Sequence, residues 1–153
     1  MRRSVIALAI CCSAPFLLPV SSSVAAPVGV NSGTLVVNTL FDPAADSPVL
    51  QATGVFSRCT SVTQLDQDNT FPPGTDVFSG HKRINCADGT LVVAYVATSD
   101  KKLPGAHGSW SVVAGTGAYA GANGGGRLTG DDNGCDPMGT DGCVLDLYTG
   151  SLA

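Results

Sequence analysis

The chain has 153 residues, with 8 basic and 12 acidic side chains and a formal net charge of −4 at pH 7. All of the acidic residues are Asp, and no excess of Lys and Arg exists to form a phosphate-binding face, which argues against nucleic-acid binding. The low charge content, the 19 Gly residues and the absence of Glu favour strands and turns over helices.

The first 25 residues are typical of a secretory signal peptide. Arg2 and Arg3 precede an apolar run over 5–18, and Ser23-Val24-Ala25 supplies the small side chains that signal peptidase requires. Pro15 interrupts the run and Pro19 follows it, and the run is shorter than the roughly 20 residues needed to span a bilayer. We therefore expect cleavage after Ala25 and a secreted or extracellular product. Its mature chain, 26–153, would form one domain without a membrane span.

The remainder of the chain alternates short β-like runs with turn residues. The predicted strands are 34–40, 51–59, 61–66, 76–86, 90–98, 109–113, 125–129 and 144–152. Their hairpin spacing predicts an all-β, closed antiparallel eight-stranded barrel, since closure removes the exposed edges of a sheet. In the run 76–86, Phe78 and Ile84 share one face with Lys82, while the other face is polar. A barrel of this size can be filled by side chains or can hold one small ligand, and the pattern leaves both open.

Four cysteines follow the predicted signal peptide, and an even number in an exported domain indicates disulfides. We favour Cys59 with Cys86 and Cys135 with Cys143, because each pair joins neighbouring predicted strands or closes a short loop. Each bridge would contribute about 2–4 kcal/mol to stability. The alternative, a four-cysteine zinc site, lacks the closely spaced cysteine pairs that such sites use.

The segment 108–130 is rich in glycine around a single Trp, and a backbone that turns sharply or packs against other backbone needs such residues. Trp110 is interpreted as a core anchor, Thr116 as a turn residue and Tyr119 as a plug at one barrel end. The pattern Gly115-x-Gly117-x-x-x-Gly121 is not a dinucleotide fingerprint, since it has one residue too many and no following helix. The spacing that carries most information comprises Gly108, Trp110, Gly115, Thr116, Gly117, Tyr119 and Gly121.

That spacing, with Gly124-x-Gly126 and the closing run 146–152, resembles barrels related to allene oxide cyclase and to plant dirigent proteins. The resemblance covers the C-terminal third of the chain and includes exported bacterial barrels. It implies an eight-stranded calycin-like barrel, often with an apolar lumen and often dimeric or trimeric. Enzymes of the family cyclise or isomerise, and dirigent members guide the coupling of phenoxy radicals. The catalytic residues of the cyclases have no matching positions here, and a Glu-dependent mechanism is excluded because the chain contains no Glu.

Several polar residues have both a functional and a plain interpretation. His81 and His107, the two imidazoles, could shuttle protons near neutral pH, but a solvated strand position and an exposed loop position explain them more simply. The Asp-rich loop 131–143 lacks EF-hand spacing and is interpreted as a hairpin tip rather than a calcium site. We expect no metal and no cofactor.

Asp146 lies in an apolar strand and alternates with Val144 and Tyr148, so it could project into the lumen, where burial would suit acid–base chemistry. The favoured alternative is an outward ion pair with Arg127 on the preceding strand. The catalytic candidates are Asp146, Tyr148, Tyr95 and Arg83.

Three functions are compatible with the sequence. The first is a non-enzymatic exported barrel that binds a small apolar or aromatic molecule or serves a structural role. The second is a cofactor-independent cyclase, isomerase or dirigent-type coupling guide that acts in the lumen. The third is a cell-surface interaction module that uses the loops 42–49 and 68–76. An open lumen with at least two inward polar groups would favour catalysis, and a lumen filled by aliphatic side chains would exclude it.

Overall fold

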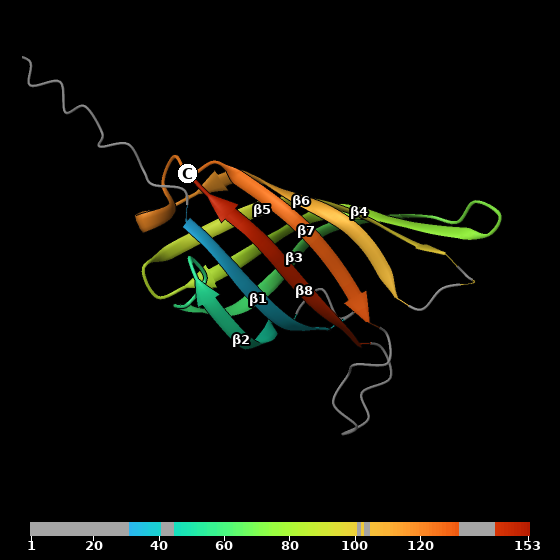
Figure 1. Cartoon of the computed structure of the whole chain (residues 1–153), viewed down its shortest axis with the longest axis horizontal. Helices are drawn as coiled ribbons and strands as arrows, with labels where there is room; N and C mark the ends of the chain where they lie inside the picture. The colour runs from blue at the N-terminus through green and yellow to red at the C-terminus, as the bar shows by residue number, and fades with distance from the viewer. Residues whose placement is uncertain (1–30, 41–44, 101, 103–104, 132–142) are drawn as a thin grey trace, which may run out of the picture.

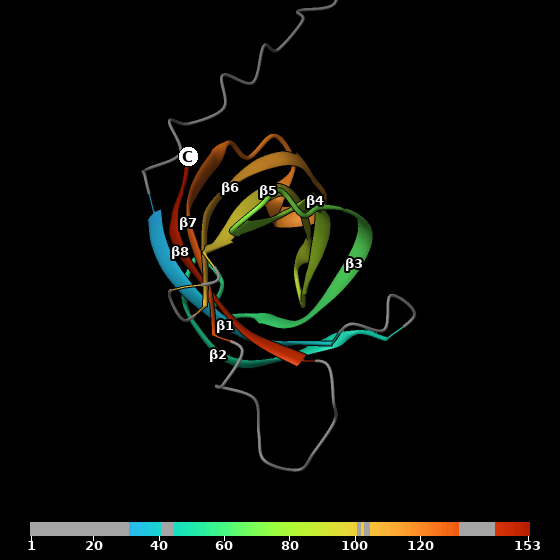
Figure 2. The same ribbon diagram turned by 90° about the vertical axis from the view of Figure 1, so that its right-hand side faces the viewer.

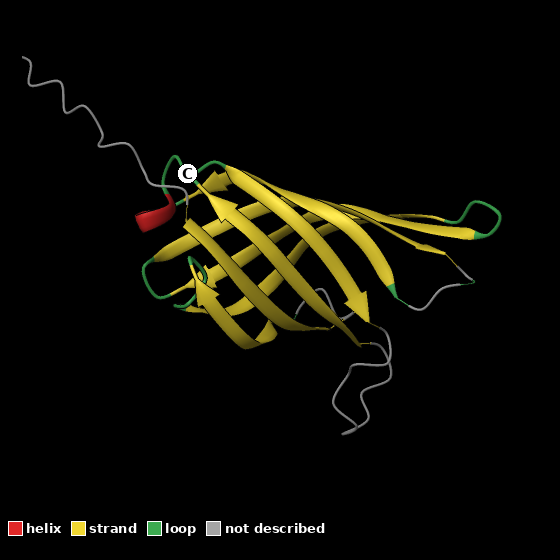
Figure 3. Ribbon diagram, viewed as in Figure 1, coloured by secondary structure: helices red, strands yellow, loops and turns green. Residues whose placement is uncertain are grey.

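The computed structural model describes residues 31–40, 45–100, 102, 105–131 and 143–153. In these ranges eight antiparallel strands follow one another around a closed barrel, which confirms the predicted fold class (Figure 1). The strands are β1 (Asn31–Leu40), β2 (Ser47–Gly54), β3 (Cys59–Thr70), β4 (Thr75–Cys86), β5 (Gly89–Asp100), β6 (Ala106–Gly115), β7 (Gly124–Asp131) and β8 (Cys143–Leu152). The short 3₁₀-helix η1 (Gly117–Tyr119) lies between β6 and β7 (Figure 3). The predicted signal peptide lies outside the described residues.

The barrel closes through its first and last strands. β1 pairs with β8 over its full length, from Asn31 opposite Leu152 to Leu40 opposite Cys143. The strands form a ring in Figure 2. The contact between β2 and β3 is the shortest, with Ser47 opposite Val62 and Pro48 opposite Ser61. β3 and β4 continue well past this contact as a long hairpin, which forms the green extension at the right of Figure 1.

Some predicted boundaries were wrong. The expected strand 51–59 ends at Gly54, and a turn over 55–58 carries the completely buried Phe56 before β3 begins. Most of the expected loop 68–76 is strand, so only 71–74 connect β3 to β4. β6 begins at Ala106, which places His107 in a strand rather than a loop. In the first case Gly54 has φ +57°, a left-handed conformation, where the strand ends. In the other two cases a polar or glycine-rich sequence is paired into the sheet by its neighbours, because tertiary pairing overrides local propensity.

The predicted disulfide between Cys59 and Cys86 is confirmed. The two residues are direct cross-strand partners at one end of the β3–β4 hairpin, which places their side chains side by side. These two sulfurs are bonded to each other, so they are not free thiolates for a zinc site. The second predicted pair includes Cys135, which lies outside the described residues.

One end of the barrel is closed by an aromatic cluster, which we call the plug. The ring of Trp110 packs edge-on against Phe56 at a centroid distance of 5.8 Å and against Tyr148 at 6.5 Å. The buried Tyr119 of η1 donates a hydrogen bond from its hydroxyl to the backbone carbonyl of Val55. The interpretation of Trp110 as a core anchor and Tyr119 as an end plug therefore agrees with the structure.

Glycines beside the plug make room for the indole. Trp110 is the cross-strand partner of Gly126, which is opposite Gly150, which in turn is opposite Gly33. A Cβ built on Gly150 would lie 2.5 Å from Cζ2 of Trp110, and one on Gly33 would lie 3.0 Å from the Phe56 ring. Gly150 and Gly33 therefore leave space for aromatic rings, whereas a Cβ on Gly126 would meet the backbone of Thr149 and Gly150. The close approach of Gly126 to backbone agrees with the predicted packing of backbone against backbone in this region.

Corner residues are also present, between β6 and β7. The Thr116 hydroxyl oxygen accepts the backbone N–H of Thr90 at 3.0 Å, which fixes this corner to the start of β5. Gly117 has φ +59°, a left-handed conformation that favours glycine. The predicted roles of Thr116 and Gly117 are consistent with this geometry.

Candidate functional site

A cavity of about 150 Å³ occupies the lumen at the end opposite the plug, which we call the mouth. The mouth is the end at which β4 and β6 begin and β5 and β7 end. Five strands contribute apolar side chains to the cavity wall, namely Phe78, Ala97, Ala106, Leu128 and Val144. The lumen is thus filled by aromatic rings at one end and hollow at the other.

An ion pair lies inside this apolar surrounding. The ammonium of Lys82 on β4 is 2.6 Å from Oδ2 of Asp146 on β8, and the two residues are only 4% and 7% exposed. The Thr39 hydroxyl on β1 donates a second hydrogen bond to the same carboxylate oxygen, also at 2.6 Å. All three side chains line the cavity. Removing two charges from water is expensive, so each depends on the other for compensation.

Two tyrosine rings flank the ammonium group. Nζ of Lys82 lies 5.1 Å from the ring centroid of Tyr95 and 5.8 Å from that of Tyr148, distances at which ring faces attract a cation. Burial raises the pKa of the Tyr95 hydroxyl. Burial also raises the pKa of the fully buried Tyr148 well above its usual value, and the nearby Asp146 carboxylate raises it further. Both phenols are therefore neutral at physiological pH and can act as hydrogen-bonding groups.

The favoured outward position of Asp146 was wrong, and the lumen alternative is the one observed. Arg127 is opposite Thr149 and faces outward, whereas Asp146 is opposite Gly130 and points into the barrel. Of the four catalytic candidates, Tyr95 and Asp146 line the cavity and Tyr148 lies beside them in the core. Arg83 is exposed on the outer face of β4, so it does not join them.

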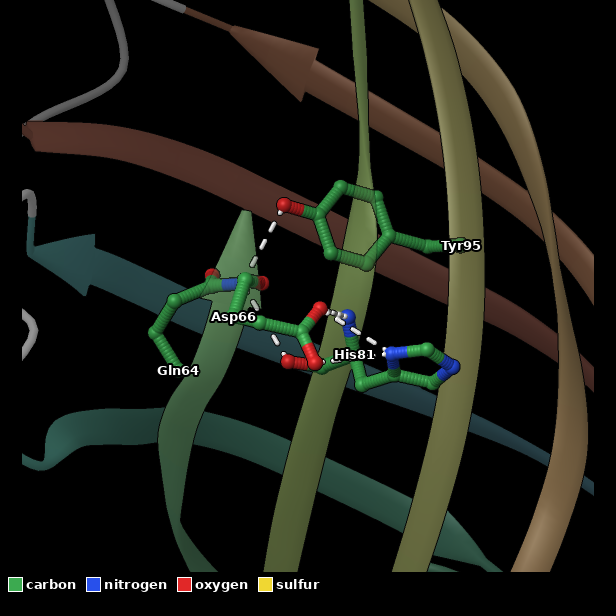
Figure 4. A network of polar contacts seen from close by, with 4 residues as sticks. All are labelled: Gln64, Asp66, His81 and Tyr95. Atoms are coloured by element: carbon green, nitrogen blue, oxygen red, sulfur yellow. Dashed lines mark hydrogen bonds and ion pairs between the residues drawn. The ribbon is translucent and has the colours of Figure 1, made fainter. Parts of the chain in front are cut away.

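A polar network connects the lumen to the outer surface through β3 (Figure 4). Leu65 is the extra residue of a β-bulge opposite β4, and the bulge lets Gln64 and Asp66 face opposite sides of the barrel wall. The side-chain nitrogen of Gln64 donates to the Tyr95 hydroxyl at 3.2 Å and to the backbone carbonyl of His81 at 3.2 Å. Gln64 thereby fixes the position of the Tyr95 phenol above the cavity.

The two histidines lie on the outside. Nδ1 of His81 is 2.9 Å from Oδ2 of Asp66, and the Asp66 carboxylate also accepts the His81 backbone N–H, as Figure 4 shows. Both side chains are largely solvated, so such a pair contributes little. His107 is exposed on β6. Neither imidazole is in the described lining of the cavity.

Sequence reasoning missed Lys82, Thr39 and Gln64. For Lys82 a signal was available, because it occupies the face of its strand that carries Phe78 and Ile84, and an unpaired Lys rarely lies on a buried face. Thr39 and Gln64 gave no comparable signal, since a polar residue near the end of a strand is ordinary. The Asp-rich loop 131–143, interpreted from the sequence as a hairpin tip, falls almost wholly outside the described residues.

Comparison of the chain with protein-family models, with curated proteins and with solved structures finds no match. Function is therefore inferred from the geometry of the lumen. Within the described ranges, no helix is long and apolar enough to cross a membrane. The same ranges contain no group of three or more His, Cys or Asp side chains placed to hold a metal ion.

Proposed function

We propose that the protein is an exported barrel that binds one small, mostly apolar or aromatic molecule at the mouth end of its lumen. The main support for this proposal is the cavity of about 150 Å³, whose apolar walls surround the Lys82–Asp146 pair. Ligand sites commonly combine an apolar lining with a few converging polar groups that fix orientation. A cavity of about this volume can accommodate a single benzene-sized ring.

The buried ion pair supports a ligand-binding role over a purely structural one. Replacing such a pair by well-packed apolar residues is often neutral or stabilising, so a barrel that needs only stability gains little from it. Here the pair also lies at a space that packing has left open. Lys82 and Asp146 would contact the polar group of a ligand whose ring lies against Phe78, Ala97 and Leu128.

Two further considerations support the proposal. The disulfide between Cys59 and Cys86 is compatible with an oxidising, extracellular environment, which agrees with the expected signal peptide. The resemblance to allene oxide cyclase and dirigent barrels, which we retain as a proposal, leads to the same expectation of a lumen that accepts apolar molecules.

Catalysis is the second candidate, because the lumen is open and carries several inward polar groups. Asp146 could accept a proton, Lys82 could stabilise a developing negative charge, and Tyr95 could donate a hydrogen bond. A cofactor-independent isomerase or cyclase requires these three groups: a proton acceptor, a stabiliser of negative charge and a hydrogen-bond donor. A surface interaction module is less well supported, because the exposed large apolar residues include Leu50 on β2, Phe71 at a hairpin tip and Val113 on β6, which lie on separate elements.

The test is a cavity-filling substitution with a matched control on the same strand. Ala97→Leu places a larger side chain in the cavity, whereas Ala94→Leu places it on the outer face of β5. We expect toluene and benzyl alcohol to raise the melting temperature of the wild type and of Ala94→Leu, because a ligand that binds only the native state stabilises it. The shift should be lost in Ala97→Leu. Equal shifts in all three proteins would show that the probes bind elsewhere.

A further inference from the structure

We propose that the lumen selects carbonyl compounds, and that the Lys82 amine captures a small aldehyde or ketone as an imine. This inference rests on the ligand-binding role proposed above and names the chemical class of the ligand. It starts from the position of Lys82, which is one of three lysines in the chain and is buried at the cavity with its ammonium group on Asp146. Lys102, in contrast, is exposed.

Charge balance decides which ligands the cavity accepts. Lys82 and Asp146 neutralise each other in a site with little access to water. An anionic ligand would compete with Asp146 for one ammonium and leave a net negative charge buried, and a cationic ligand would do the converse with Lys82. Uncompensated buried charge costs several kcal/mol, so a neutral ligand is strongly favoured. Among neutral ligands that offer an acceptor oxygen to the ammonium group, aldehydes and ketones are the ones whose carbonyl carbon can also bond to the Lys82 amine.

The carboxylate is placed to activate the amine. Transfer of one proton from the Lys82 ammonium to Asp146 Oδ2, across 2.6 Å, gives a neutral amine and a carboxylic acid without changing the net charge of the site. The two atoms are within hydrogen-bond distance, so this transfer needs no intervening group. The neutral amine is the nucleophile for carbonyl addition, and the carboxylic acid is the proton donor for the next step.

The reaction balances without an oxidant or reductant. The amine adds to the carbonyl carbon to form a carbinolamine, and the Asp146 acid protonates its hydroxyl as it leaves. The products are one water molecule and a C=N bond to Nζ of Lys82. Of the two amine hydrogens, one leaves with that water molecule and the other stays on nitrogen, so the product is an iminium ion beside the Asp146 carboxylate.

The site suits this product because the iminium ion keeps the positive charge of the original ammonium. Asp146 remains paired, its hydrogen bond from Thr39 is kept, and the Tyr95 and Tyr148 rings still flank a cation. Acylation of Lys82 would instead remove the charge and leave Asp146 buried without compensation. The surroundings therefore favour a reversible imine over other lysine adducts.

The experiment is reductive trapping of the folded, full-length secreted chain with benzaldehyde and sodium cyanoborohydride at neutral pH, followed by chymotryptic peptide mapping. We expect a benzyl group on Lys82 at a rate at least about tenfold above that on Lys102, because the cavity holds the aldehyde against the amine. Chain unfolded in urea should lose the preference. Trapping of Lys82 no faster in the folded chain than in the unfolded chain would overturn the inference.

Two controls separate the inference from the proposed function. Lys82→Arg keeps the charge on Asp146 but offers no amine that forms an imine, so lumen trapping should disappear while labelling of Lys102 is unchanged. Benzyl alcohol has the same ring but no carbonyl group. If it raises the melting temperature while Lys82 is not trapped by benzaldehyde, the imine is wrong and the binding role stands. If neither probe acts on the lumen, both proposals fail.

Discussion

Lys82 and Asp146 meet across the lumen from β4 and β8, two strands that do not pair with each other. Each charge lies among apolar walls and beside the rings of Tyr95 and Tyr148, and each residue is less than a tenth exposed. The pair thus ties opposite walls of the barrel together only as long as both residues are present.

Removing one partner should cost far more than removing both. We expect Lys82→Met or Asp146→Leu to lower the free energy of unfolding by about 3–5 kcal/mol each, because the remaining charge is buried and uncompensated. The double variant should lose clearly less than the sum of the two single losses, since it leaves no charge behind. Urea unfolding at pH 7 measures all three. Additive losses would mean that the two side chains do not stabilise each other.

Single residues also show where prediction from sequence stops. The alternation in β8 offered the lumen for Asp146, but the outward ion pair with Arg127 was favoured, and that choice was wrong. The inward position of Asp146 depends on Lys82, which is 64 residues away on β4. The alternation of residues in β7 and β8 carries no information about that strand. Contacts across a lumen depend on the diameter of the barrel and the stagger of its strands, and a local sequence pattern determines neither.

At the level of elements, Gly126, Gly150 and Gly33 form a cross-strand row that continues from Trp110. As a result β7, β8 and β1 carry no side chain at this level of the barrel. A Cβ on Gly150 would meet the indole and one on Gly33 would meet the Phe56 ring, whereas one on Gly126 would meet the backbone of β8. The glycines and the aromatic residues are therefore one packing unit spread over several strands.

We expect Gly150→Ala to destabilise the protein by about 1–3 kcal/mol, the usual cost of overpacking a core. Its new methyl group would lie 2.5 Å from Trp110 Cζ2 and 2.3 Å from the backbone carbonyl oxygen of Gly125, which cannot move without disturbing the β7–β8 pairing. Gly130→Ala is the matched control, because its methyl group would meet only side-chain atoms, at 3.0 Å and beyond. Thermal unfolding compares the two variants, and a larger loss in Gly130→Ala would contradict this account of the plug.

The elements themselves were largely predictable, because strand rhythm and turn residues are local signals. The closed meander, the pairing of Cys59 with Cys86 and the buried position of Trp110 are all confirmed. The end of β2 at Gly54 and the length of the β3–β4 hairpin were missed. Pairing between β3 and β4 decides the length of the hairpin, whereas β2 ends at Gly54, which has φ +57°.

The whole molecule has two unlike ends, a mouth with a cavity that Tyr95 lines and an end closed by the plug, in which Tyr148 packs against Trp110. Tyr148 is completely buried, and burial raises its pKa well above the ordinary value of 10.0 that the unfolded chain would have. Since the barrel wall around Tyr148 must open to hydrate this phenol, its ionisation is coupled to unfolding.

This coupling predicts alkaline unfolding. Below pH 10 the phenol is protonated in both states and has no effect on the pH dependence of stability. Above pH 10 only the unfolded chain releases the proton, so the free energy of unfolding falls by up to about 1.4 kcal/mol per pH unit for this one group. Tyr148→Phe lacks the hydroxyl and should lose stability less steeply above pH 10, while the lysines, which also titrate in this range, are common to both proteins. Urea unfolding at several pH values between 8 and 11 measures the two slopes. Parallel slopes would show that Tyr148 ionises without opening the barrel, and the lumen would then be far more accessible to water than its burial implies.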